Sequence, residues 1–490
     1  MTSTNNIVFR SEQQQAIDLT VNSLKRNRKM LWNAKMRFGK TLCALEVARL
    51  CGYRRTLILT HRPNVRGEWF ESLLKLKLDG WLFGCKDPNA VAFDAQTFEA
   101  IEAKAKQDKN THYIYFASMQ DLRGSKRVNQ QKGIEKNDHI FNTHWDFLIV
   151  DEAHEGIMSR LGRDVIGELQ KRRTLRTLYL SGTPYNIQQM FDNTEVYHWD
   201  YCMEQSAKAA WTQAHANQPN PYEGLARMNI ITYNLAREMR SYRISESGAF
   251  NFAELFRTEN VPADEATNSA TTRFVHEADV RKFVKLISKN STNKLYPYAN
   301  KQLSGSLDHT LWYVPGVQAA HCLARILSEQ TPDNPFGQYA IVDVAGEGNS
   351  AEERSDIYEQ TKHERDALER VKTTIANNKL TITLSCGRLT MGVSVPEWTA
   401  VLMLAGAAET GGMRYFQTIF RCQSPYTDAR VKTECYAIDF SPCRTLTVVD
   451  QYVNNNTYTS NQEERVAKLS EFLDLCPITE ISASKQTRFD

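Results

Sequence analysis

Two short segments hold the residues best suited to chemistry, and each begins where an apolar, β-rich run ends. The first is Ala34–Thr41, with the sequence AKMRFGKT, which follows the run Met30–Asn33 and opens a helical pattern. Backbone N–H groups of such a loop, together with a helix N-terminus, can surround a phosphate group. In this arrangement Lys40 reaches the β- and γ-phosphate oxygens and Thr41 binds Mg²⁺. The segment predicts a binding loop for the phosphates of ATP.

This loop departs from the usual pattern at its first position, where Ala34 replaces a glycine, a change that the loop tolerates. The residues expected to lie against the nucleotide between Ala34 and Lys40 are Met36, Arg37, Phe38 and Gly39. Taken alone, the pattern leaves open a coincidental strand–turn–helix that binds no ligand.

The second segment is Asp151-Glu152-Ala153-His154, which follows the apolar run Phe147–Val150. Two carboxylates at the end of a buried strand suit a magnesium nucleotide. Asp151 would hold the metal through water, and Glu152 would act as the general base that polarises the attacking water. Two adjacent acids can also form a solvated turn. The phosphate-binding loop upstream disfavours that reading, because the two motifs have the order that a phosphate-loop ATPase requires.

The elements that must position these residues alternate between strands and helices over residues 1–190. The runs Met30–Asn33, Thr56–Thr60, Tyr113–Ser118, Phe147–Val150 and Thr177–Ser181 are typical of strands in a parallel sheet that is covered on both faces. The segment Ser11–Gln14 has capping-box form and predicts the start of a helix, and Lys40–Leu50 predicts another. This part of the chain is expected to be α/β.

The pattern weakens over residues 191–304, which we interpret as a linker or insertion with helices, the clearest at Asp279–Ile287. A second α/β pattern occupies residues 305–450, and residues 451–490 are expected to form a helical extension that leads to a further domain of a longer polypeptide. The strands expected in the second pattern are Thr310–Val314, Ala340–Val344, Thr381–Ser385, Ala400–Leu404 and Cys435–Phe440. A long charged helix is expected around Leu368 and Val371.

The ordered motifs of the chain resemble those of superfamily-two helicases with a DEAH box. Within that superfamily they are most similar to the ATPase subunits of restriction systems and their phage or bacterial relatives. The resemblance covers nearly the whole chain and rests on segments in order: Phe9-Arg10 with Gln13, Met36–Thr41, Thr60–Pro63, Ser118–Gln120, Asp151–His154, Ser181–Pro184, Cys386–Pro396 and Gln417–Pro425. It implies an α/β fold of two RecA-like parallel-sheet lobes in tandem.

The resemblance also implies a role for each matching residue. Arg10 and Gln13 would read adenine, and Gly392 would belong to the nucleotide site. Ser181 and Thr183 would couple the nucleotide state to strand movement, with His154 touching that segment or the last motif. The residues implied to hold the nucleic-acid backbone are Thr60, Arg62, Ser118 and Gln120 from the first lobe, and Thr390 with Gly392 from the second. For Thr60 and Ser118 a plain helix cap after a strand stays open.

The last motif departs from the family pattern Gln-x-x-Gly-Arg-x-x-Arg, because Phe420 replaces its glycine and Ser424 its second arginine. Arg421 is therefore the favoured arginine for the γ-phosphate, with Gln417 as its water-contacting partner. Arg414 is the alternative if the loop is shifted. Ser394 stands where many relatives have an aspartate for the ribose, so the resemblance does not extend to ribose recognition.

The overall charge excludes a protein that coats nucleic acid by charge alone, since 60 basic and 57 acidic residues give a net charge of +3. Any contact with nucleic acid must therefore be made by a local cluster of basic residues. The simpler alternative is that each cluster is an ordinary solvated helix end or loop. The clusters are Lys25, Arg26, Arg28 and Lys29, then Arg123, Lys126, Arg127 and Lys132, then Lys171, Arg172, Arg173 and Arg176. The ten cysteines form no CxxC pair, and no apolar run could cross a membrane, so a cytoplasmic protein with reduced thiols is expected.

The sequence therefore predicts an ATP- and Mg²⁺-dependent helicase or translocase, with DNA favoured over RNA and a restriction or defence system as its setting. No nuclease or methyltransferase centre is recognisable, so such an activity is expected on a following domain or a partner subunit. The alternatives are an ATP-gated clamp on DNA and a translocase that moves along duplex DNA without separating the strands.

Overall fold

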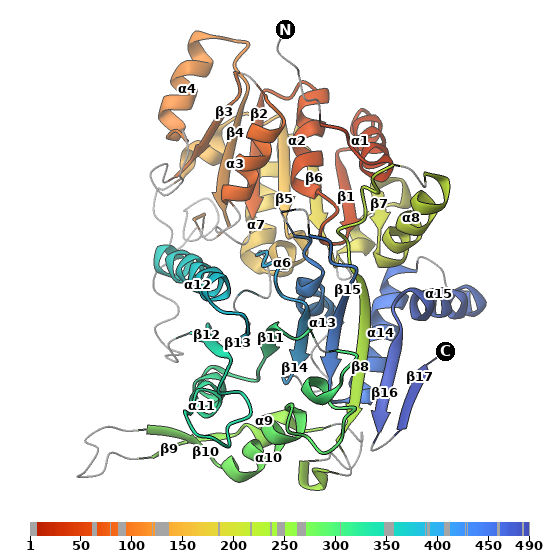
Figure 1. Cartoon of the computed structure of the whole chain (residues 1–490). Helices are drawn as coiled ribbons and strands as arrows, with labels where there is room; N and C mark the ends of the chain where they lie inside the picture. The colour runs from red at the N-terminus through yellow and green to blue at the C-terminus, as the bar shows by residue number, and fades with distance from the viewer. Residues whose placement is uncertain are drawn as a thin grey trace. The chain divides into compact units, whose positions relative to one another are not determined.

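The computed structural model describes residues 7–489, apart from residues 61–65, 79, 87–94, 120, 123–136, 185–186, 216–217, 236–237, 243–249, 262–270, 304, 347–356, 388, 390–392, 406–411, 427, 429, 458–460 and 483–484. The chain divides into two compact units, Met1–Met203 and Glu204–Asp490. Each unit is built on its own sheet (Figure 1).

The sheet of the first unit has seven strands in the order β3-β4-β2-β5-β6-β1-β7, and every pairing is parallel. The strands are β1 (Lys29–Ala34), β2 (Arg55–Thr60), β3 (Leu82–Cys85), β4 (Tyr113–Ser118), β5 (Phe147–Asp151), β6 (Arg176–Ser181) and β7 (Val196–Trp199). The five apolar runs predicted from the sequence are confirmed as the five central strands. The two edge strands, β3 and β7, are short and escaped the prediction.

Helices cover both faces of this sheet. They are α1 (Ser11–Ser23), α2 (Lys40–Leu50), α3 (Arg66–Lys75), α4 (Phe98–Gln107), α5 (Asp138–Asn142), α6 (Ala153–Met158) and α7 (Arg160–Gln170). On one face, residues such as Ile101 of α4 and Val165 of α7 pack on Leu57 and Leu148 from the strands. On the other, α1 packs on α2 and α2 on α3 (Figure 1). Because both faces are covered, the central strands are apolar along nearly their whole length.

The start of α1 differs by one residue from the predicted capping box. Arg10 is the N-cap, and its backbone N–H donates to Gln13 Oε1 at 2.8 Å. The glutamine side chain thus satisfies a backbone donor at the helix start. This places Gln13 in the first turn of α1.

The second unit has an eight-stranded sheet in the order β12-β13-β11-β14-β15-β8-β16-β17, in which only the β16–β17 pairing is antiparallel. The strands are β8 (Arg227–Asn234), β11 (His309–Tyr313), β12 (Ala340–Asp343), β13 (Thr381–Ser385), β14 (Ala400–Met403), β15 (Glu434–Asp439), β16 (Ile478–Ser482) and β17 (Lys485–Phe489). A separate hairpin pairs β9 (Thr258–Val261) with β10 (Thr271–Phe274).

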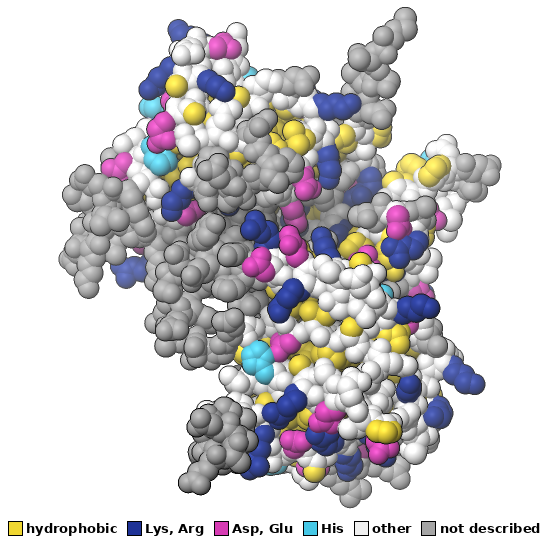
Figure 2. Space-filling model, turned by 60° about the vertical axis from the view of Figure 1, so that its left-hand side comes forward, with side chains coloured by type: hydrophobic (Ala, Val, Ile, Leu, Met, Phe, Trp, Pro, Cys, Tyr) yellow, Lys and Arg dark blue, Asp and Glu magenta, His cyan; other side chains and the backbone are white. Residues whose placement is uncertain are grey.

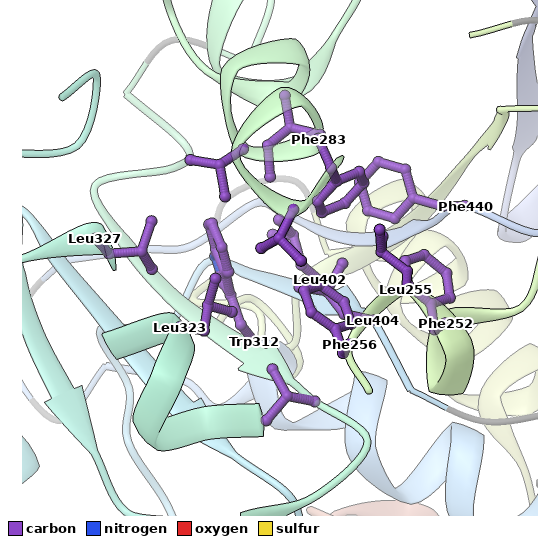
Figure 3. Close-up of a cluster of buried hydrophobic side chains, with 14 of the residues drawn as sticks. Phe252, Leu255, Phe256, Phe283, Trp312, Leu323, Leu327, Leu402, Leu404 and Phe440 are labelled. Carbon is purple, nitrogen blue, oxygen red and sulfur yellow. The ribbon is translucent and has the colours of Figure 1, made fainter. Parts of the chain in front are cut away.

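The helices of this part of the chain are α8 (Tyr201–Ala214), α9 (Phe252–Leu255), α10 (Glu277–Ile287), α11 (Val317–Leu327), α12 (Ile357–Asn377), α13 (Gly412–Ile419), α14 (Pro442–Asn456) and α15 (Gln462–Leu475). The core of the second unit is rich in aromatic side chains. Figure 3 shows Phe252 of α9 and Phe283 of α10 beside Phe440, which follows β15. Trp312 of β11 and Leu402 of β14 belong to the same buried cluster.

From the sequence we expected residues 191–304 to form a linker or insertion between the two α/β patterns. In the structure they contribute strands to both sheets instead. Strand β7 lies at the edge of the first sheet, whereas β8 pairs with β15 inside the second. The residues 451–490, expected to be helical, include α15 and then β16, which pairs with β8. The sequence did not predict strands β8 and β16, because each mixes buried and half-exposed positions and neither is a continuous apolar run.

The surface is mixed in charge. On the face shown in Figure 2, basic and acidic side chains are interspersed among polar ones, in keeping with the small net charge. Within the described residues, none of the helices combines the length and apolar character needed to cross a membrane. All ten cysteines carry free thiols.

Candidate nucleotide-binding site

The predicted phosphate-binding loop connects the end of β1 at Ala34 with the start of α2 at Lys40. Gly39 caps the helix with a φ of 94°, a left-handed conformation that glycine adopts without strain. A Cβ atom at this position would lie 2.6 Å from Gln13 Nε2. Arg37 is also left-handed, with a φ of 73°. The turn therefore requires glycine at position 39 and holds one strained residue ahead of it.

Arg10 and Gln13, the residues implied to read adenine, contact the backbone of this loop. Gln13 Nε2 donates to the carbonyl oxygen of Phe38 at 2.6 Å, and Arg10 Nη2 donates to the same oxygen at 3.1 Å. The amide of Gln13 has a second N–H and a second lone pair, which suit the donor and acceptor edge of adenine. The structure thus brings the start of α1 and the phosphate-binding loop together.

The side chain of Phe38 anchors the loop in the core. It is fully buried, and its ring centroid lies 6.1 Å from that of Trp32, 5.8 Å from that of Tyr197 and 6.2 Å from that of Trp199. Aromatic rings at these separations attract one another in tilted and edge-to-face arrangements. The ring of Phe38 therefore fixes the loop on β1 and β7, and of the predicted contacts of Phe38 with a nucleotide only those of its backbone fit this position.

Lys40 lies inside the loop. Its Nζ donates to the carbonyl oxygens of Ala34 at 2.7 Å and Lys35 at 3.2 Å. Burial lowers the pKa of Lys40, whereas the charges of Glu152 and Asp151 raise it. Thr41 follows in the first turn of α2 and is half-buried. The lysine ammonium and the two carboxylates therefore belong to one electrostatic cluster.

The two carboxylates end β5. Burial, with the neighbouring charge of Glu152, raises the pKa of Asp151 to about 7. Trp69 Nε1 donates to Asp151 Oδ2 at 3.2 Å, and the backbone N–H of Glu152 donates to Oδ1 at 3.0 Å. Glu152 itself is left-handed, with a φ of 47°. A buried carboxylate beside a second acid is costly in its charged form, and a divalent cation would offset that cost, so the donor set fits Mg²⁺.

His154 connects this pair to the Ser181 segment. His154 Nδ1 and Ser181 Oγ lie 2.8 Å apart, and His154 Nδ1 lies 3.6 Å from Glu152 Oε2. The backbone N–H of Thr183 donates to Ser181 Oγ at 3.1 Å. These contacts form a continuous path from Glu152 to Thr183. The role expected for His154, Ser181 and Thr183, which is to couple the nucleotide state to strand movement, stays a prediction. Such a role requires contacts between the three residues, and these contacts are present.

Of the residues implied to hold nucleic acid, the structure describes Thr60 and Ser118. They are paired in register at the carboxyl ends of β2 and β4, and Thr60 is also paired with Asp151. Both side chains are fully buried. Ser118 Oγ donates to Asp121 Oδ2 at 2.7 Å and accepts from the backbone N–H of Asp121 at 3.0 Å, which closes a turn after β4; none of the described residues directly after Ser118 starts a helix. Arg62, Gln120, Thr390 and Gly392 lie outside the described residues.

In the second unit, Arg421 lies in the 3-10 helix Phe420–Gln423 that follows α13. Its side chain is buried, and Nη1 donates to the carbonyl oxygen of Val393 at 2.6 Å. Gln417, on α13, is also buried, whereas Arg414 on the same helix is exposed. The bond from Arg421 to Val393 thus joins two motif segments, and the two bonded residues are 28 positions apart in the chain. The residue that makes this link is Arg421 rather than Arg414.

The basic clusters of the first unit fit the simpler alternative of ordinary helix ends. Arg28 Nη2 donates to the carbonyl oxygens of Gln170, the last residue of α7, and of Arg172 just after it, at 2.9 and 3.1 Å. Arg176 Nε donates to that of Leu24, directly after α1, at 2.8 Å. Cations at the C-termini of helices satisfy carbonyls that lack partners in the helix. The cluster at Arg123, Lys126, Arg127 and Lys132 lies outside the described residues.

Sequence reasoning missed two features of the site. One is Trp69, which is 82 residues from Asp151 in the chain. The other is His198 of β7, which contacts Asn33 Nδ2 through Nδ1 and Asp200 Oδ2 through Nε2, each at 3.0 Å. The aromatic run around His198 was visible in the sequence, but only the pairing of β7 with β1 brings it beside the loop.

Comparison with known families supports the sequence-based expectation for the first unit. Residues 6–186 match the family model ResIII, described as "Type III restriction enzyme, res subunit". This range contains the phosphate-binding loop, the two carboxylates and the Ser181 segment.

Among curated proteins, the chain is similar to a Mycoplasma pneumoniae protein named as a type II restriction enzyme and methyltransferase, RM.MpnORF110P C-terminus. The two are 26% identical over 479 residues, which cover 87% of this chain and 63% of that protein. The chain therefore spans less than two thirds of the length of this relative.

Among solved structures, the chain is similar to the "ATP-dependent Type ISP restriction-modification enzyme LlaBIII bound to DNA". The TM-score is 0.55 at 12% identity, covering 98% of this chain and 32% of that one. Saccharomyces cerevisiae Dbp5 bound to RNA and ADP BeF3 gives a TM-score of 0.45 at 11% identity, over 96% of this chain and 89% of that one. The likeness to LlaBIII shows the fold. The chain carries two RecA-like α/β units in tandem, and the match to the ResIII model lies within the first of them.

Proposed function

We propose that this chain is an ATP-dependent DNA helicase or translocase of the DEAH-box kind, and that it acts within a restriction or defence system. One observation carries the proposal: Lys40, Asp151 and Glu152 form a single cluster whose contacts continue through His154 to Ser181. The ResIII match over the same residues supports it. DNA is favoured as the partner because LlaBIII is described as bound to DNA.

The proposed mechanism assigns one task to each group. Thr41 and Asp151 would hold Mg²⁺, which supplies positive charge against the phosphate oxygens. Lys40 would leave the carbonyl oxygens of Ala34 and Lys35 for the β- and γ-phosphates. Glu152 would orient the attacking water and polarise it as general base.

The second unit would contribute Arg421 and Gln417 to the same reaction. An arginine at the γ-phosphate stabilises the charge that develops in the transition state. Gln417 would contact the attacking water. Release of the products would then change the grip of the protein on the phosphodiester backbone, and repeated cycles would give net movement.

Two variants test the ATPase assignment. Lys40→Ala is expected to abolish DNA-stimulated ATP hydrolysis, and Glu152→Gln to lower kcat while ATP still binds. Lys104→Ala and Glu99→Gln, on the exposed surface of α4, are the matched controls and should leave turnover unchanged. Wild-type turnover in the Glu152→Gln protein would refute the role assigned to Glu152.

An ATP-gated clamp on DNA is the second candidate function, favoured by the departures at Phe420 and Ser424 in the last motif. The dependence of ATP turnover on DNA length separates the two. A motor travels further between releases on longer DNA, so its turnover rises with length, whereas turnover by a clamp is independent of length. Displacement of a bound third strand without unwinding of the duplex would identify a duplex translocase.

A further inference from the structure

The side chain of Lys432 holds four backbone carbonyl groups in the second unit. Its Nζ donates to the carbonyl oxygens of Trp398 at 2.7 Å, Cys422 at 3.0 Å and Ser424 at 3.0 Å, and makes a further short contact to that of Pro396. Lys432 is only 5% exposed. An ammonium group has three N–H donors, so at least one of them is shared between two oxygens.

These four carbonyls lie in or directly beside two different motif segments. Pro396 ends the segment that begins at Cys386 and Trp398 lies two residues beyond it, whereas Cys422 and Ser424 both follow Arg421 in the last motif. Arg421 links the same two segments a second time, because its Nη1 donates to the carbonyl oxygen of Val393. The ammonium of Lys432 and the guanidinium of Arg421 therefore hold the segments together at two neighbouring points.

The turn around Arg421 is held by further contacts within the second unit. The Oγ of Ser424 donates to the carbonyl oxygen of Arg421 at 2.9 Å, and Gln423 Nε2 donates to that of Ala226 at 2.6 Å. These bonds fix the turn to itself and to the start of β8. The bonds from Lys432 tie the backbone that directly follows Arg421 to residues 396–398. Charge-assisted hydrogen bonds of this kind are about twice as strong as neutral ones, so they dominate the placement.

We propose that Lys432 is the positioning residue for Arg421: its ammonium fixes the backbone directly after Arg421 against residues 396–398. The inference rests on the proposed role of Arg421 in ATP hydrolysis. Lys432 does not touch the nucleotide in this scheme. It acts by presenting Arg421 in one position, so its loss should affect the transition state, where Arg421 acts, more than the binding of ATP.

The first test is a split between kcat and KM. Lys432→Met, which keeps the length and apolar body of the side chain, is expected to lower kcat for ATP at least tenfold while KM changes less than twofold. Lys379→Met, in the exposed turn after α12, is the control and should change neither. If Lys432→Met does not fold, Lys432→Gln replaces it, because the amide keeps two N–H donors without the charge.

Chemical rescue separates positioning from a general loss of packing. Lys432→Ala leaves the four carbonyl oxygens without their cation, and ammonium or methylammonium ions should restore part of kcat. Tetramethylammonium has no N–H donor and should not. Rescue by all three ions alike, or by none of them, would overturn the proposal.

A double variant links the effect to Arg421. If Lys432 acts through Arg421, Lys432→Met should cause no further loss of kcat in an Arg421→Ala background, whereas multiplied losses would overturn the proposal. If Arg421→Ala keeps wild-type turnover while Lys40→Ala is inactive, the ATPase assignment stands and the positioning proposal falls. Loss of stimulated turnover in the Lys379→Met control as well would also count against it.

Discussion

The buried ion pair between Asp439 and Arg444 gives the sharpest prediction about stability. Asp439 ends β15 and is fully buried, and Arg444 is 2% exposed on α14. Arg444 Nε donates to Asp439 Oδ2 at 3.1 Å, with a second bond from Nη2 to Oδ1. The guanidinium also donates to the carbonyl oxygens of Ala405 at 2.7 Å and Met403 at 3.0 Å. Arg444 thus ties the end of β14 to the end of β15.

Arg444→Met removes these bonds and leaves a buried carboxylate without its cation. Removing one partner of a buried pair costs about 3–5 kcal/mol. Asp439 retains the backbone N–H groups of Phe440 and Ser441, at 2.6 and 3.1 Å, so we expect the lower half of this range, about 3–4 kcal/mol. With a slope of about 5 kcal/mol per molar guanidinium chloride, the midpoint for the second unit should fall by about 0.6–0.8 M.

The assay is hydrogen exchange of peptides from β14 and β15 at increasing denaturant, because it reports on the second unit alone. The control is Arg281→Met, which removes the exposed ion pairs of Arg281 with Glu277 and Glu329. This change should lower the free energy of unfolding by about 1 kcal/mol or less. The double variant Asp439→Asn/Arg444→Met should be less destabilised than the sum of the single variants. An Arg444→Met protein as stable as Arg281→Met, or strict additivity in the double variant, would refute this account of the pair.

Two further predictions concern the nucleotide site. Gly39→Ala should weaken binding of a fluorescent ATP analogue at least tenfold, because a left-handed alanine is strained and its Cβ would displace Gln13. The control is Gly167→Ala on α7, where a Cβ meets nothing within 4 Å, and this variant should bind the analogue normally in the same titration. Trp69→Phe removes the hydrogen bond to Asp151, and a loss of about 1–1.5 kcal/mol in orienting the carboxylate should lower kcat about fivefold to tenfold in a steady-state ATPase assay at saturating Mg²⁺. An unchanged kcat for Trp69→Phe would mean that the indole does not orient Asp151.

Local patterns in the sequence determined the frame of both sheets. The run Phe147–Val150 is strand β5, and Lys40–Leu50 is helix α2 without any shift in its bounds. Strands buried on both faces and helices that begin at a glycine turn carry strong local signals. The placement of Lys40, Asp151 and Glu152 followed from the same signals, because each residue stands directly at the end of such an element.

Only the tertiary structure decided which distant residues complete each site. Nothing near Asp151 in the sequence points to Trp69, and nothing near Arg421 points to Val393 or Lys432, because these contacts depend on how separate elements pack. The same reason explains β7, β8 and β16, whose short or half-exposed patterns become strands through pairing with a neighbour. The sequence thus determined which residues can do chemistry, whereas packing between elements decided what holds them in position.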